Sequence, residues 1–149
     1  MKTALIFLIC VLAAPLFGQQ PADEEGRGSF RVVDIYVDSK GAPLAAYQLR
    51  LSITNTGAKI VGIEGGEHPA FRKPPVYDPK AIQHERVIIA AFNTGSSDEL
   101  PKGKTRVATI HVRSMGDEAL QCRLRMQTAA NPEGTRIAIE ATWEERKNK

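Results

Sequence analysis

Residues 86–95 read RVIIAAFNTG and contain the longest unbroken apolar run outside the N-terminus, at 87–92. Val87, Ile88 and Ile89 are β-branched, which favours an extended strand. The run is short and ends in Asn-Thr-Gly, which is typical of a strand followed by a turn rather than of a helix. Because no polar residue interrupts it, the run predicts a central strand that is covered on both faces.

The other apolar segments alternate with polar residues, most clearly at 45–54. There Tyr47, Leu49, Leu51 and Ile53 point to one side, as in a strand with one packed and one solvated face. With turn residues between the segments and no helix longer than about two turns, the sequence predicts an all-β, two-sheet antiparallel sandwich of jelly-roll or immunoglobulin-like type. The remaining strands are predicted at 30–38, 59–64, 105–113, 120–128 and 136–143.

The chain starts with Met-Lys, followed by an uncharged apolar run at 4–17 and by Gly18, which is the pattern of a secretory signal peptide. Pro15 and Gly18 make this run shorter than the roughly 20 apolar residues that a membrane span needs. We therefore predict a secreted or periplasmic protein that is cleaved near Gly18, with an uncleaved membrane anchor as the alternative. The predicted divisions are a signal peptide at 1–18, a disordered leader at 19–29, a β-sandwich at 30–144 and a charged tail at 145–149.

The formal net charge is +3, and residues of both signs are interspersed, so the composition does not favour nucleic acid binding. The chain has two cysteines, and Cys10 lies in the predicted signal peptide. Cys122 therefore has no partner for an intrachain disulfide after cleavage. It alternates with polar residues in a row that includes Leu120, Leu124 and Met126. This position predicts a buried, unreactive thiol.

A proline-rich stretch at 67–85 is longer than the usual loop of a compact domain, and such loops often carry function. Its titratable residues lack the HxH, HExxH and CxxC spacings of metal sites, and no carboxylate pair suited to glycoside hydrolysis is identifiable. We therefore predict no catalytic residues, no metal and no cofactor. Asp78 is expected to cap a helical turn that starts at Pro79, and His111 to lie on a strand surface. The titratable candidates weighed are Glu64, Glu67, His68, Asp78, His84 and Glu85.

Four segments follow one another in an order and spacing that resembles cohesin domains, the β-sandwich modules of bacterial scaffolding proteins. They are AAYQLRL at 45–51, VGIEG at 61–65, AAF at 90–92 and VATIHV at 107–112. The resemblance covers most of 30–143 and implies docking of a protein partner, either dockerin-like or another exported protein. Carbohydrate-binding modules share this sandwich, so polysaccharide binding is implied as an alternative. Cohesins usually carry an Asp-Pro turn where this chain has Thr-Asn-Thr-Gly.

Two sets of side chains are candidates for binding. Gln48 and Arg50, together with Arg123 and Arg125, are predicted to form an outward polar face suited to a protein partner. Phe71 and Tyr77 form the alternative set: they either stack on a sugar or hold the proline-rich loop on the core.

Three functions remain open from the sequence. They are an exported, non-catalytic module that recognises a protein, a carbohydrate-binding module linked to polysaccharide use, and a periplasmic structural protein without a ligand. The outward rows are rich in Arg, Gln, Ser and Thr and poor in aromatic residues. This composition favours the protein-binding function over sugar stacking.

Overall fold

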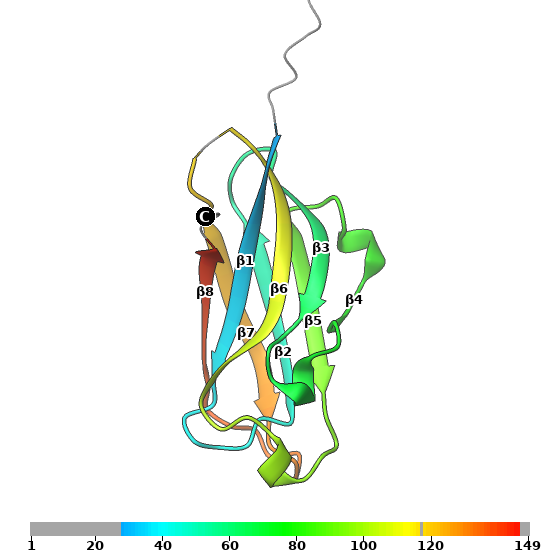
Figure 1. Cartoon of the computed structure of the whole chain (residues 1–149), viewed down its shortest axis with the longest axis vertical. Coiled ribbons are helices and arrows are strands. Elements are labelled where there is room, and N and C mark those ends of the chain that lie inside the picture. Colours follow the sequence, from blue (N-terminus) through cyan, green and yellow to red (C-terminus); the bar gives the residue numbers. More distant parts are fainter. Residues whose placement is uncertain (1–27, 117, 147–149) are drawn as a thin grey trace, which may run out of the picture.

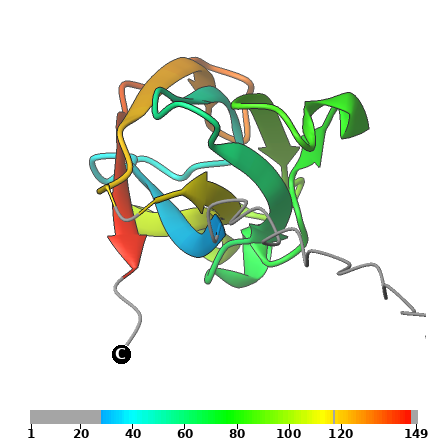
Figure 2. The ribbon, with the colours of Figure 1, turned by 90° about the horizontal axis from the view of Figure 1, so that it is seen from above.

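The computed structural model describes residues 28–116 and 118–146, which form two four-stranded antiparallel sheets (Figure 1). Seen along its long axis, the molecule is a sandwich of two layers (Figure 2). This arrangement confirms the predicted all-β sandwich. The predicted signal peptide and nearly all of the predicted leader lie outside the described residues.

The two sheets have strand orders β3-β6-β1-β8 and β4-β5-β2-β7. Every connection except the one from β4 to β5 crosses from one sheet to the other. Apart from β4 and β5, neighbouring strands therefore come from distant parts of the sequence. The strands are β1 (Gly28–Asp38), β2 (Ala46–Ile53), β3 (Lys59–Gly65), β4 (Val76–Tyr77), β5 (Arg86–Phe92), β6 (Lys104–Met115), β7 (Cys122–Ala130) and β8 (Glu140–Arg146).

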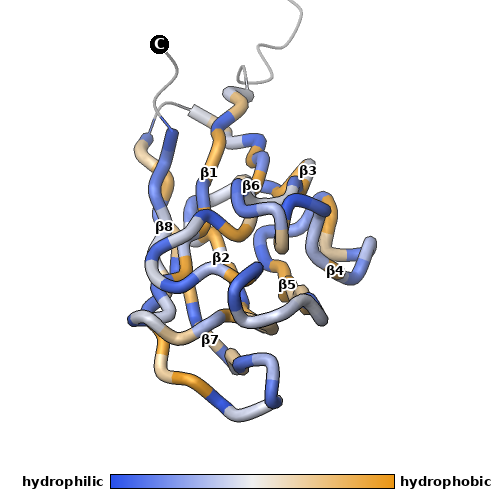
Figure 3. The backbone as a smooth tube through the Cα atoms, turned by 60° about the horizontal axis from the view of Figure 1, so that its bottom comes forward, coloured by the Kyte–Doolittle hydropathy of each residue, from blue (hydrophilic) through white to orange (hydrophobic). Residues whose placement is uncertain are grey.

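The core lies between the sheets and follows from the alternation of apolar and polar residues along the strands, which is visible in Figure 3. On β2, Tyr47, Leu49, Leu51 and Ile53 are all buried, as predicted. From the opposite sheet, β1 and β6 contribute Val33, Ile35, Val37, Ile110 and Val112. One face of each of these strands is therefore packed against the other sheet.

The prediction for β5 is correct for one of its faces and wrong for the other. Val87 and Ile89 are buried in the core, but Ile88 is 39% exposed and Phe92 is 75% exposed. The strand lies second from the edge of its sheet, between β2 and the two-residue strand β4. Its second apolar face is therefore turned outward and has no layer of the described chain over it.

The last strand is shifted toward the C-terminus from its predicted position. It runs from Glu140 to Arg146, two residues into the predicted charged tail, and pairs with β1. Ion pairs hold its end: Arg31 Nη1 lies 2.7 Å from Glu145 Oε1, and Arg146 Nη2 lies 2.7 Å from Asp34 Oδ1. Charge in this segment thus stabilises strand pairing, which a pattern of apolar residues could not reveal.

The proline-rich loop contains two short 3₁₀ helices and is anchored by one aromatic residue. Phe71 is 2% exposed, and its ring packs edge-on against that of Tyr47 with 5.3 Å between the ring centroids. The helices are Pro69–Phe71 and Pro79–Ala81. The Asp78 side chain accepts a hydrogen bond from the backbone nitrogen of Lys80, which confirms the predicted cap.

Substitution of Gly66 tests how closely the chain approaches β6 where the proline-rich loop begins. A Cβ atom at Gly66 would overlap the carbonyl oxygen of Arg106, and backbone on both sides would have to move. We expect Gly66→Ala to lower the free energy of unfolding by about 1–3 kcal/mol, as for other overpacked sites. Urea denaturation would measure the loss. Gly62→Ala is the matched control, because the Cβ would meet only ordinary contacts with His111; an equal effect of both changes would contradict this explanation.

Substitution of Arg146 tests the contribution of the ion pair at the end of β8 to stability. Its guanidinium donates hydrogen bonds of 2.7–3.0 Å to both carboxylate oxygens of Asp34, which is buried. Arg146→Ala should cost about 1–3 kcal/mol of stability, because a buried carboxylate loses its charged donors. Thermal and urea unfolding would measure the cost. The exposed Arg136→Ala should stay within about 0.5 kcal/mol of the unchanged protein, and a similarly small effect at Arg146 would be the contradictory result.

Candidate functional site

The outward face of the β4-β5-β2-β7 sheet brings together all four residues that were predicted to bind a protein. Arg50 of β2 lies directly opposite Arg125 of β7, and Arg123 lies opposite Ser52 one step further along. Gln48 Nε2 donates a hydrogen bond of 2.6 Å to Gln127 Oε1 across the same pair of strands. We call this surface the outer face.

Arg86 extends the predicted set, because it begins β5 and pairs with Ser52 from the other side. Four arginines thus gather on three adjacent strands at one end of the outer face. None of them forms a salt bridge with another described residue. The Nε atom of Arg50 is buried and has no hydrogen-bond partner in the described part of the chain. We call this end the arginine cluster: Arg50, Arg86, Arg123 and Arg125.

The opposite end of the outer face is apolar, and the sequence-based prediction did not include it. Phe92 of β5 and Val76 of β4 are 75% and 71% exposed, and Ile88 lies between them and the arginine cluster. A shallow hollow of about 370 Å³ lies here, lined mainly by small and apolar side chains. We call this end the apolar end: Val76, Ile88, Phe92 and the alanines at 46, 90 and 130.

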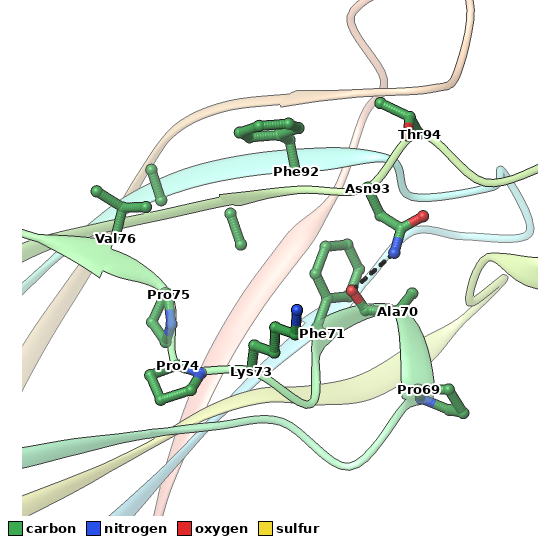
Figure 4. A pocket seen from close by; sticks show the side chains of 12 residues that line it. Pro69, Ala70, Phe71, Lys73, Pro74, Pro75, Val76, Phe92, Asn93 and Thr94 are labelled. Atoms are coloured by element: carbon green, nitrogen blue, oxygen red, sulfur yellow. Dashed lines mark hydrogen bonds between the residues drawn. The ribbon is translucent and has the colours of Figure 1, made fainter.

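A second hollow, of about 380 Å³, adjoins the apolar end between β5 and the proline-rich loop (Figure 4). Pro74, Pro75 and Lys73 border it on the loop side. The side chain of Asn93 closes one side by donating a hydrogen bond of 3.0 Å to the Ala70 carbonyl oxygen. The figure shows Phe92 and Phe71 on opposite sides of β5. One ring is therefore turned to the surface while the other belongs to the core.

The sequence contained the signal for the apolar end, but it allowed two interpretations. Ile88, Ala90 and Phe92 alternate with inward residues, so both faces of β5 are apolar. Such a run is typical of a strand with a layer on each side. In this structure the described chain covers only the inward face of β5. The exposed outward face is what the sequence did not reveal.

The pair proposed for sugar stacking does not form a platform. Phe71 is buried against Tyr47 and presents no face to solvent. Tyr77 is half-buried and packs against the core. Sugar stacking needs exposed rings, so the structure gives Phe71 the other predicted role, that of holding the loop on the core.

Four of the six titratable candidates, namely Asp78 described above and three others, have local hydrogen-bond partners. His68 Nδ1 accepts a hydrogen bond from Ala70 N, and Glu67 Oε1 accepts one from Arg106 N. Glu64 Oε1 lies 2.9 Å from Nε2 of His111, which is partly exposed on β6. Among the residues that the structure describes, no group of three or more His, Cys, Asp or Glu side chains is placed to hold a metal ion.

The expectation of a buried Cys122 is wrong in degree, because its side chain is only partly buried. It points toward the core, as predicted, together with Leu124 and Met126, which are also partly buried. The reason is that β7 is the edge strand of its sheet, so the inward row is open on one side. Burial still raises the pKa of the thiol to about 11, with a smaller contribution from Glu145.

Comparisons with known proteins provide no relative: no family model matched, and searches of curated proteins and of solved structures returned no significant match. Within residues 28–116 and 118–146, no helix has the length and hydrophobicity needed to cross a membrane. The fold and the outer face alone define the class of protein. It is an all-β sandwich with a surface that is apolar at one end and basic at the other.

The raised pKa of Cys122 predicts how the labelling rate of its thiol depends on pH. Below the folded-state value of about 11 the thiol stays protonated, and the thiolate is the reacting species. In a Cys10→Ser background, labelling by a thiol reagent should be slow at neutral pH and should increase as the pH rises toward 11. The same protein unfolded in urea should titrate near the ordinary value of 9.0. A folded-state midpoint at or below that value would contradict the stated environment.

Proposed function

We propose that this protein is an exported, non-catalytic binding module that recognises a protein partner through the outer face of the β4-β5-β2-β7 sheet. The observation that carries the proposal is the uncovered apolar face of β5. Ile88 and Phe92 lie on a regular strand, and Val76 lies beside them on β4. Contiguous exposed apolar side chains with a polar surround are characteristic of interaction surfaces.

The polar part of the face supports a protein as the ligand. Arginine and aromatic residues are enriched in protein interfaces, where an apolar centre is bordered by polar groups. Here Phe92 and Ile88 supply the apolar part. Arg50 lies directly opposite Ile88, and Arg125 lies on the far side of Arg50. A partner with a matching apolar and acidic surface would cover both parts.

The other two functions have less support. In the described part of the outer face Phe92 is the only aromatic residue with a strongly exposed ring, and a sugar-binding platform usually needs more than one. A structural protein without a ligand gives no reason for the uncovered face of β5. The resemblance to cohesin domains adds an analogy for docking on a sheet face. Export through the predicted signal peptide belongs to the same proposal.

Substitution of Phe92 tests the proposal. Phe92→Ser should leave the fold intact, because the side chain lies outside the core. We expect it to weaken binding of the natural partner about tenfold or more, as for an aromatic residue that a partner covers. The partner would first be identified by crosslinking in the organism that makes the protein. The dissociation constant would then be measured with both proteins purified.

Phe30→Ser is the matched control, because Phe30 is an exposed phenylalanine on β1 in the other sheet. Loss of binding with Phe92→Ser but not with Phe30→Ser supports the proposal. Equal effects of the two changes, or retention on cellulose or chitin that depends on Tyr77, would contradict it. Association of two copies that is lost with Phe92→Ser would make the partner a second copy of this chain.

A further inference from the structure

The arginine cluster contains like charges at short range. Arg50 and Arg125 are directly opposite across the β2–β7 ladder, and Arg123 and Arg86 flank Ser52 on either side of β2. Side chains directly opposite on adjacent strands have Cβ atoms about 4.5–5.5 Å apart, and like charges there are destabilising. The sheet therefore carries a repulsion that its own residues do not relieve.

The composition of this sheet explains why the charges are unpaired. Strands β2, β4, β5 and β7 contain no aspartate or glutamate. The other sheet differs, since Asp34 and Glu145 there are paired with Arg146 and Arg31. Three arginines of that other sheet, Arg31, Arg106 and Arg146, thus have acidic partners from the chain. The described chain gives the arginines of the outer face none.

We infer that the arginine cluster is a carboxylate-binding site, and that its ligand is an acidic segment of the partner polypeptide. This inference rests on the proposed function and names the chemistry of the partner. A guanidinium presents paired donors that match a carboxylate. None of the four arginines has an acidic partner among the described residues. A carboxylate bound on the cluster would offset the repulsion between Arg50 and Arg125.

The two ends of the outer face also determine the order of groups along the ligand. Arg86 and Phe92 begin and end β5, so they lie about 20 Å apart at about 3.3 Å per residue. An extended segment of similar length would place its acidic residues on the arginine cluster and its apolar residues over Phe92. The ligand is thus a segment with acidic side chains gathered at one end and apolar side chains at the other.

Synthetic peptides provide the test, with the purified protein followed by nuclear magnetic resonance so that weak binding is still measured. The first peptide has glutamates at one end and leucine and phenylalanine at the other. The second has the same composition with the two kinds of residue interleaved, and the third has glutamine in place of glutamate. We expect the first to bind most tightly, to shift amide signals of β5 and β7, and to weaken as ionic strength rises.

Variants that remove arginine charges from the protein complement the peptide experiment. Arg123→Gln with Arg125→Gln should weaken the first peptide about tenfold or more and remove the preference over the glutamine peptide. The control is Arg113→Gln, which removes an exposed arginine of β6 in the other sheet and should change little. Equal binding of the glutamate and glutamine peptides, no shifts at millimolar peptide, or an unchanged affinity in the double variant would each overturn the inference.

Two further outcomes separate this inference from the proposed function. If the natural partner is lost with Phe92→Ser but is unaffected by Arg123→Gln with Arg125→Gln, the proposed function stands and the inference fails. If an anionic polysaccharide such as heparin binds through the arginines while no peptide binds, the ligand class is a sugar polyanion. The inference then fails. If Phe92→Ser also leaves the natural partner bound, the inference and the proposed function both fail.

Discussion

The buried side chain of Tyr47 joins three parts of the molecule. It extends from β2 into the core, its hydroxyl donates a hydrogen bond of 3.1 Å to the Val107 carbonyl oxygen in the opposite sheet, and its ring packs against Phe71 of the proline-rich loop. Burial raises the pKa of this hydroxyl, so it remains protonated and acts as the donor. The two sheets and the loop are thus held together at one side chain.

This anchor also shapes the apolar end of the outer face, because it fixes the loop that carries Val76. With Phe71 fixed in the core, the chain that follows it passes along β5 and places Val76 beside Ala90. The apolar end therefore combines residues of the regular strands β2, β5 and β7 with Val76, which the loop brings beside them. Its composition depends on the packing of an aromatic ring on the other side of the sheet, which connects the stability of the core with the shape of the surface.

The sequence predicted the fold well because period-two alternation is unambiguous where only one face of a strand is apolar. Tyr47, Leu49, Leu51 and Ile53 illustrate this: their positions followed directly from the pattern. The same reasoning failed for Phe92, because an apolar residue on an outward face has the same pattern as one under a second layer. It also placed β8 too early, since Arg146 contributes through its ion pair with Asp34.

The candidate site was predicted in part. The four polar residues met on one face because their strands are neighbours, and alternation gave the direction of each side chain. Val76 could not be placed in this way, because only the observed course of the loop brings it next to β5. The same limit applies to Cys122, whose partial exposure depends on β7 being an edge strand.

The brevity of β4 has a consequence for how safely the protein can expose an apolar strand. Edge strands with unpaired backbone groups invite pairing with other chains and lead to aggregation. Pro74 and Pro75 precede the two residues of β4, and Pro79 follows them closely. Proline has no backbone N–H to donate, so this margin of the sheet cannot continue into a long ladder. This margin can thus offer side chains to a partner while its own backbone resists pairing with the strands of another molecule.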